Sequence, residues 1–270
     1  MTQLRSGPAW LFCPADRPDR YRKAADRADV VILDLEDAVA PQHRPAARDA
    51  LAAATLEPDR VVVRINAIGT DDHAADLAAV RRTPFRTVML AKSEGPEQVG
   101  ALAELAVVAL CETPRGVVNA AGLAALPNVV ALMWGAEDLI AAMNGRSSRW
   151  PDGRYRDVAR QARSTVLLAA AAHGVAAIDS VYTMIGDLDG LRLECDDAVA
   201  SGFAHKACIH PDHAAVVRET FRPMPHEVDR ARRVLAAMRG GGVAEVDGHM
   251  IDSPLIRQAE AVLRAAEEPS

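Results

Sequence analysis

The stretch Val30–Asp37, VVILDLED, joins an unbroken apolar run to a cluster of three acids. A strand that is covered on both faces has such a run instead of alternating polar residues, as in parallel sheets. The acids Asp34, Glu36 and Asp37 all lie at the end of the run. Because a buried charge is costly unless it is paired or bound to a metal, acids gathered at one end of a buried strand indicate a site of chemistry.

Similar apolar runs recur along the chain, separated by segments rich in alanine and leucine whose charges follow a helical spacing. The other runs are Ala9–Cys13, Val61–Ile65, Thr87–Ala91, Val107–Cys111, Val129–Trp134, Ala177–Tyr182 and Ala207–Ile209. The helical segments include Pro45–Ala54, Asp72–Arg82, Pro96–Ala106, Asp157–His173 and Leu188–Gly202. Eight strand-then-helix units predict an α/β fold, a (β/α)8 TIM barrel, which usually takes about 250 residues. An open doubly wound sheet is the alternative, but the sequence has no GxGxxG motif after the first strand and no P-loop.

The pattern changes after the eighth run, and we predict two parts. Residues 1–221 form the barrel, with a closing helix at Pro211–Phe221, and residues 222–270 form a C-terminal appendage. In the appendage we expect a helix at Glu227–Arg239, a hairpin or lid at Val243–Ile251 and a last helix at Pro254–Ala266. A piece of this size is too small for an independent core, so it is an extension of the barrel.

Composition excludes several classes of protein. Half of the 270 residues are hydrophobic and the net charge is −6, which argues against a general nucleic-acid binder and against a disordered chain. No run of apolar residues is long enough for a membrane helix, and the first ten residues lack the apolar block of a signal peptide. The four cysteines form no CxxC pair. We therefore expect reduced thiols in a cytoplasmic protein that has neither a nucleic acid nor a membrane as partner.

Two carboxylates follow neighbouring predicted strands. Glu112 comes after the fifth strand and Asp138 comes after the sixth. Catalytic groups of TIM barrels lie at the carboxyl ends of the strands, so these two acids are expected to meet. A pair of hard oxygen ligands, completed by water and substrate, is the usual protein share of a Mg²⁺ site. Helix capping or pairing with arginine remains the alternative for each acid.

Basic groups lie at the same predicted rim. Arg64 ends the third strand and could hold a carboxylate or an enolate oxygen, or form a structural ion pair with Glu36 or Asp37. Lys92 ends the fourth strand, where an ion pair or a substrate contact is favoured over a Schiff base. Arg17, Arg20 and Lys23 follow the first strand, either as an anion site or as a solvated helix face.

Seven motifs in register resemble the HpcH/HpaI aldolase and citrate lyase β-subunit family, over about Gly7 to Arg264. They are WLFCPADRPDR, VVILDLEDAV, VVVRINA, TVMLAKSE, ALCETPRGV, LMWGAEDL and CIHP. The resemblance implies a carbon–carbon lyase that depends on Mg²⁺, with Mn²⁺ as a substitute. Its expected substrate is a β-hydroxyacyl-CoA thioester such as malyl-CoA, citramalyl-CoA or HMG-CoA. Cleavage would give acetyl- or acyl-CoA and a keto acid, and thioester hydrolysis could follow condensation as in malate synthase.

By matching motifs, the resemblance also implies roles for individual residues. Glu112 and Asp138 become the metal ligands, and Arg64 becomes the group that binds the keto acid or its enolate. Glu36 and Asp37 become catalytic acids that orient Arg64 and the waters around the metal. Asp252, in the segment GHMIDSP, becomes an acid/base that reaches a neighbouring subunit's site. That role requires a homo-oligomer, a trimer or a hexamer.

Further positions become substrate contacts. The backbone amides of Gly135, Ala136 and Glu137 would face the substrate carboxylate, with Lys92 also in contact. The CoA phosphates would be bound by a basic group: Arg17, Arg20 and Lys23.

Two other functions stay open at this point. One is a class II aldolase that acts on free hydroxy-keto acids without CoA. The other is a citrate lyase β-subunit that depends on carrier-protein partners. The acyl group and the direction of the reaction are left open by the sequence.

Overall fold

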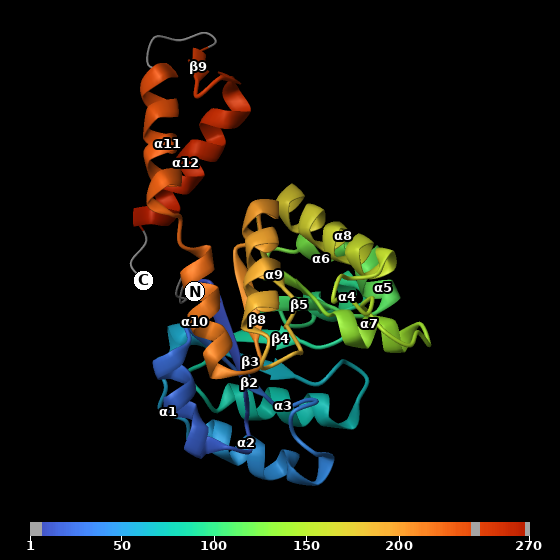
Figure 1. The fold of residues 1–270 in the computed structure, drawn as a ribbon. Helices are drawn as coiled ribbons and strands as arrows, with labels where there is room; N and C mark the ends of the chain where they lie inside the picture. Colours follow the sequence, from blue (N-terminus) through green and yellow to red (C-terminus); the bar gives the residue numbers. More distant parts are fainter. Residues whose placement is uncertain (1–6, 239–243, 268–270) are drawn as a thin grey trace. The chain divides into compact units, whose positions relative to one another are not determined.

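The computed structural model describes residues 7–238 and 244–267. Eight parallel strands form a closed barrel in which each strand pairs with the next along the chain and β8 pairs with β1 (Figure 1). The strands are β1 (Ala9–Pro14), β2 (Val30–Asp34), β3 (Val61–Ile65), β4 (Thr87–Leu90), β5 (Ala106–Cys111), β6 (Val129–Trp134), β7 (Ala176–Asp179) and β8 (His205–Cys208). The predicted TIM barrel is therefore confirmed.

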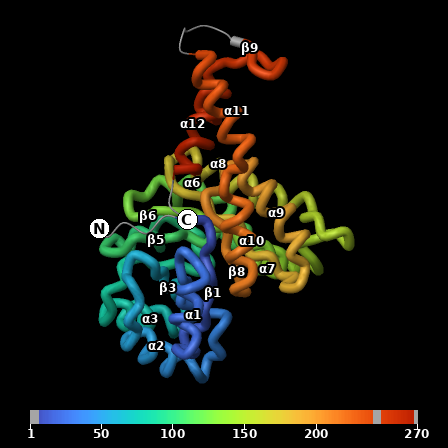
Figure 2. The backbone as a smooth tube through the Cα atoms, turned by 60° about the vertical axis from the view of Figure 1, so that its left-hand side comes forward, coloured from blue at the N-terminus to red at the C-terminus, as the bar shows by residue number. Residues whose placement is uncertain are grey.

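Helices follow the strands and cover the outside of the barrel. They are α1 (Pro18–Arg27), α2 (Arg44–Ala52), α3 (Asp71–Arg81), α4 (Pro96–Gly100), α5 (Pro114–Val118), α6 (Ala120–Ala124), α7 (Ala136–Ala142), α8 (Asp157–His173), α9 (Leu188–Ser201) and α10 (Pro211–Phe221). In Figures 1 and 2, α1, α2 and α3 lie together beside the first strands, and α8 and α9 lie beside the later ones. Several helices begin with proline, whose missing N–H costs nothing at a helix start.

The inside of the barrel is filled by alternate residues of the strands. The interior side chains include Ile32, Val62, Met89, Leu110 and Met133, all of them buried. The intervening residues point outward and are buried under the helices, which explains why the strands are apolar without alternation. Because this interior is packed with apolar side chains, the charged groups that point into the barrel lie near the carboxyl ends of the strands.

One predicted helix is too long. The pattern over Pro96–Ala106 predicted a single helix, but α4 ends at Gly100 and residues 101–105 form turns. Ala106 already pairs with Thr87 in the barrel, so the chain must turn back before it. The buried side chains of Leu102 and Leu105 gave this turn the apolar spacing of a helix.

The chain divides into two compact units, residues 1–217 and 218–270. The second unit contains α11 (Pro225–Ala237), the antiparallel strands β9 (Ala244–Val246) and β10 (His249–Ile251), and α12 (Ser253–Glu267). We expected a piece of this size to lack a core of its own, but it has a small apolar one, made of Ala231, Val234, Val246, Ile251 and Ala259. Helix, hairpin and helix thus follow in the predicted order, while the predicted helix end at Arg239 and hairpin start at Val243 lie outside the described residues. No helix in the described ranges combines the length and apolarity needed to span a membrane.

Candidate active site

The carboxyl ends of β2 to β5 bring four of the polar residues to one rim of the barrel. Asp34 is the last residue of β2 and pairs in register with Arg64 of β3. Lys92 follows β4 by two residues, and Glu112 directly follows β5. All parallel strands of a barrel end on the same side, so these side chains share one mouth.

Arg64 is held by a buried two-pronged ion pair. Its Nε donates to Asp34 Oδ1 at 2.7 Å and its Nη2 donates to Asp34 Oδ2 at 2.6 Å. The third nitrogen, Nη1, lies 3.0 Å from Glu36 Oε2 and 3.8 Å from Asp37 Oδ2. Burial alone would lower the pKa of Arg64, but the charges of Asp34 and Glu36 outweigh it and raise that pKa. The guanidinium therefore stays charged, with its plane fixed by Asp34.

Both carboxylate oxygens of Asp34 accept further hydrogen bonds besides those from Arg64. Its two oxygens also accept the backbone amides of Glu36, at 2.9 Å, and Ala38, at 3.1 Å. The sequence predicts that at least one of the three acids in DLED orients Arg64 or a metal-bound water, but it does not single out Asp34. The sequence alternative for Arg64, an ion pair with Glu36 or Asp37, is present as well, but the tightest partner is Asp34.

Lys92 and Glu36 form a second ion pair at the rim. Lys92 Nζ hydrogen-bonds to Glu36 Oε1 and lies 3.6 Å from Asp138 Oδ1. Burial raises the pKa of Glu36, and the charges of Arg64 and Lys92 oppose that shift. Burial lowers the pKa of Lys92, but the bond to Glu36 and the negative charges of Glu36, Glu112 and Asp37 together outweigh burial and raise that pKa. A lysine that stays protonated cannot attack a carbonyl carbon, which argues against a Schiff base.

Glu112 and Asp138, the two predicted metal ligands, both lie beside Lys92. Glu112 is buried, and one of its oxygens, Oε1, accepts the backbone amide of Lys92 at 3.1 Å. Asp138 lies in the first turn of α7 with its side chain 39% exposed. Burial raises the pKa of Glu112 to about 8, and repulsion from the Asp138 carboxylate adds to the shift. Two neighbouring carboxylates at the mouth of the barrel suit a divalent cation.

The donor set fits Mg²⁺ better than a transition metal. Within residues 7–238 and 244–267, no group of three or more His, Cys, Asp or Glu side chains could hold a metal ion. Mg²⁺ needs no such cage, since it is usually bound by one or two carboxylates and keeps its other positions for water and substrate. Glu112 and Asp138 supply two hard oxygen ligands of that kind.

Gly135 packs tightly against the predicted metal ligand. A Cβ at this position would lie 2.8 Å from Glu112 Cβ and 2.9 Å from Glu112 Oε2. The amide of Gly135 donates to Cys111 O, and that of Ala136 donates to Ser180 Oγ, both at 3.4 Å. The side chain of Glu137 accepts a hydrogen bond from Ser148 Oγ at 2.6 Å. The predicted amide contacts are thus close to Glu112, although two of the amides have long internal partners.

The predicted phosphate contacts lie on or just before α1. Arg17 Nε and Nη2 donate to Asp19 at 3.0 and 2.9 Å, so a bound anion would compete with that carboxylate. Lys23 lines a cavity of about 350 Å³ together with Arg27 and His210. Arg17 lies in the turn after β1 and Lys23 lies in α1, so both follow a strand that ends at the mouth.

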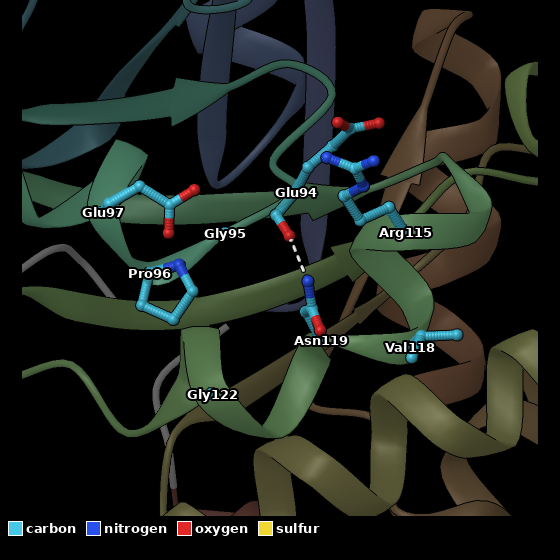
Figure 3. A pocket seen from close by; sticks show the side chains of 8 residues that line it. All are labelled: Glu94, Gly95, Pro96, Glu97, Arg115, Val118, Asn119 and Gly122. Carbon is cyan, nitrogen blue, oxygen red and sulfur yellow. Dashed lines mark hydrogen bonds between the residues drawn. The ribbon is translucent and has the colours of Figure 1, made fainter.

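Another cavity, larger than the one beside Lys23, is lined by none of these groups. It has a volume of about 560 Å³ and is lined by Glu94, Gly95, Pro96, Glu97, Arg115, Val118, Asn119 and Gly122 (Figure 3). In it, Asn119 Nδ2 donates to the carbonyl of Glu94 at 2.7 Å. None of the predicted site residues lines it, so size alone does not identify the site.

Asp252 belongs to the second unit. It lies between β10 and α12, and its carbonyl accepts the amide of Ile256 at 3.2 Å. The position suits a residue that begins a helix, and its role as an acid/base stays a prediction.

A buried ionic cluster beside the site was missed from the sequence. Lys206 is fully buried, and its Nζ donates to Asp179 and Glu194, both at 2.9 Å. Asp179 also accepts the indole N–H of Trp134, the residue before Gly135, at 2.7 Å. The sequence gives only weak signals, because Asp179 ends the apolar run of β7 and Lys206 follows His205 at the start of β8.

Comparison with known proteins agrees with this geometry. The chain is 55% identical over 269 residues to the citrate lyase subunit beta-like protein of Mycobacterium tuberculosis (strain H37Rv), covering 99% of this chain and 98% of the relative. It is 34% identical over 271 residues to the (3S)-malyl-CoA thioesterase of Cereibacter sphaeroides (strain ATCC 17025), covering 95% and 93%. The crystal structure of CitE from Mycobacterium tuberculosis in complex with magnesium, acetoacetate and coenzyme A matches with a TM-score of 0.94 and 55% identity, covering 97% of this chain and 99% of that one.

A model of the HpcH/HpaI aldolase/citrate lyase family matches residues 9–211, which include all eight strands of the barrel. The motifs predicted this family, and the relatives above match nearly their whole length. The chain therefore belongs to the HpcH/HpaI aldolase/citrate lyase family.

Proposed function

We propose that this protein is a Mg²⁺-dependent carbon–carbon lyase that cleaves or forms a β-hydroxyacyl-CoA thioester, with acetyl- or acyl-CoA and a keto acid as the other reactants. The observation that carries the proposal is that Glu112 and Asp138 both lie beside Lys92, at the mouth that also holds Arg64. The Mycobacterium tuberculosis relative, whose structure contains magnesium, acetoacetate and coenzyme A, supports the same chemistry. When bound, the cation would act as a Lewis acid on the hydroxyl and carboxylate oxygens of the acyl group.

Arg64 is proposed to stabilise the negative charge that develops on the substrate oxygen. Its Nη1 edge is the part not engaged by Asp34, and its positive charge is held in place by buried acids. A fixed donor aimed at developing charge typically contributes about 10²–10³ to the rate. Glu36 keeps both Arg64 and Lys92 at the mouth, and Asp37, whose side chain is 55% exposed, is available to orient a water molecule.

The remaining predicted residues would complete the binding site for the substrate. We propose that Gly135, Ala136 and Glu137 bind the substrate carboxylate through their amides and that Lys92 also faces the substrate. Arg17, Arg20 and Lys23 are proposed to bind the CoA phosphates, with guanidinium and ammonium donors suited to them. Binding of the CoA phosphates would distinguish this enzyme from an aldolase that acts on free hydroxy-keto acids.

The second unit is proposed to act in a neighbouring site. Asp252 would exchange the proton on the carbon that becomes the acetyl-CoA methyl group, as general acid in cleavage and as general base in condensation. Residues 222–270 would then be an appendage that completes the site of another copy. That role requires a homo-oligomer, a trimer or a hexamer.

Thioester hydrolysis is the second candidate, because the chain is 34% identical to a (3S)-malyl-CoA thioesterase. Both activities can be followed in one assay with malyl-CoA, citramalyl-CoA and HMG-CoA. Release of keto acid measures carbon–carbon cleavage, and release of free CoA thiol measures hydrolysis. Dependence on a partner would appear as activity only after a carrier protein is added.

The metal assignment is tested with the same substrates. Chelation should abolish cleavage and added Mg²⁺ should restore it, whereas Glu112→Ala should remain inactive at saturating Mg²⁺. Glu97→Ala, at an exposed glutamate of the larger cavity, is the matched control and should keep full activity. Cleavage that survives both chelation and Glu112→Ala would refute the proposal. Arg20→Ala should raise KM for a CoA thioester and leave a free hydroxy acid unaffected.

A further inference from the structure

Lys92 has a backbone conformation that lysine rarely adopts. Its φ is +50°, in the left-handed region, and within the described ranges only Asn144 and Asp247 share a positive φ without being glycine. Asparagine and aspartate tolerate this region because their short side chains hydrogen-bond locally, whereas lysine gains no such compensation. A residue held in this way persists only when its surroundings impose the conformation, and such residues gather at functional sites.

The neighbours of Lys92 impose the turn. The amide of Ala91 donates to Ile65 O at 3.3 Å, on the β3 side, and the amide of Ser93 donates to Leu110 O at 3.0 Å, on the β5 side. Ser93 is fully buried, and its hydroxyl donates to Leu90 O at 2.8 Å. The chain therefore changes hydrogen-bonding partner from one side of β4 to the other within two residues, and Lys92 absorbs the reversal.

The result is that the amide of Lys92 points at a predicted metal ligand. It donates to Glu112 Oε1 at 3.1 Å. Gly135 closes the other side, since any Cβ there would lie 2.9 Å from Glu112 Oε2. One carboxylate oxygen is thus tied to a backbone amide, and the position of the other is limited by the approach of Gly135. The orientation of this carboxylate follows from the conformation of residue 92.

We propose that Lys92 is a positioning residue for the metal ligand Glu112, and that it acts through its left-handed backbone amide. This inference rests on the proposed Mg²⁺ site. It differs from the substrate contact predicted for the same residue, which would act through the ammonium group. The ammonium bonds to Glu36 and lies near Asp138, so a test must separate the charge of the side chain from the conformation of the backbone.

Four single variants of the full chain make that separation. Lys92→Asn and Lys92→Gly remove the ammonium and permit a positive φ, whereas Lys92→Ala and Lys92→Val remove the ammonium and resist it. The dissociation constants of Mg²⁺ and of Mn²⁺, measured by calorimetry and by electron paramagnetic resonance, are compared without substrate. Circular dichroism checks that each variant is folded, and the comparison uses Lys92→Ala alone if Lys92→Val does not fold.

We expect Lys92→Asn and Lys92→Gly to bind the cation on the order of tenfold more tightly than Lys92→Ala and Lys92→Val, because alanine and valine have a Cβ but no local hydrogen bond to offset the cost of the left-handed conformation. Equal affinities across the four variants would overturn the proposal. So would equally weak binding by all four, because the ammonium alone would then be responsible. If the unaltered protein binds neither Mg²⁺ nor Mn²⁺, the proposed function itself fails, and that result is seen before any variant is compared.

Discussion

The buried carboxyl of Glu112 should make the metal-free protein less stable as the pH rises. Burial and the neighbouring Asp138 raise the pKa of Glu112 from its usual 4.5 to about 8. Between these two values the native state keeps a proton that the unfolded chain has released. The unfolded state then binds fewer protons, so the free energy of unfolding falls as the pH rises through this window.

The size of the effect follows from the shift. One pKa unit corresponds to about 1.4 kcal/mol, so the full shift of Glu112 amounts to roughly 5 kcal/mol above pH 8 and close to nothing below pH 4.5. Glu112→Gln removes the charge, retains the shape and keeps an acceptor for the Lys92 amide. In the absence of metal, this variant should match the original protein near pH 5 and exceed its stability by several kcal/mol at pH 8.5.

The assay is urea unfolding in chelator at half-unit steps from pH 5 to 8.5. Tryptophan fluorescence follows the barrel, since Trp10 and Trp134 are buried in its strands. Glu97→Gln, at an exposed position, controls for the loss of one carboxylate. Saturating Mg²⁺ should remove most of the difference by stabilising only the protein that retains Glu112. Parallel stability curves for the original protein and Glu112→Gln across this range would refute the reasoning.

Two further predictions concern the surroundings of the site. Gly135→Ala places a methyl group 2.8 Å from Glu112 Cβ, so we expect the Glu112 carboxylate to move. The affinity for Mg²⁺, measured by calorimetry, should then fall about tenfold. Unchanged affinity would show that the close packing of Gly135 against Glu112 does not matter for metal binding. Lys206→Met leaves Asp179 and Glu194 without their buried counter-ion, and urea unfolding should show a loss of about 3–5 kcal/mol. A loss below about 1 kcal/mol would mean that the cluster relaxes or takes up protons.

The barrel and its functional rim could be predicted because both follow from simple regularities. Strands buried on two faces must be apolar throughout, so each one is visible in the sequence. Parallel strands with intervening helices end on the same side, so Arg64, Glu112 and Asp138 could be expected together before any coordinates were known. The two carboxylates already indicated Mg²⁺, and the family resemblance added the expected substrate class.

The partner of Arg64 could not be predicted because it depends on register. DLED offers three acids within four residues, and periodicity does not say which one meets the guanidinium. The pairing of β2 with β3 sets Asp34 directly opposite Arg64, and this register makes Asp34 the partner of the guanidinium. Lys206 was missed for a similar reason, since its counter-ions Asp179 and Glu194 come from another strand and from a helix.

The double hydrogen bond between Asp34 and Arg64 also limits how a ligand can be recognised. Both oxygens of Asp34 are saturated by the guanidinium and by two amides, so the arginine cannot swivel to follow an incoming group. A hydrogen-bond acceptor on the ligand must instead align with the fixed plane of the guanidinium. Selection at this point therefore depends on the angle of approach as much as on charge, and a flexible ammonium at the same place would lose that discrimination.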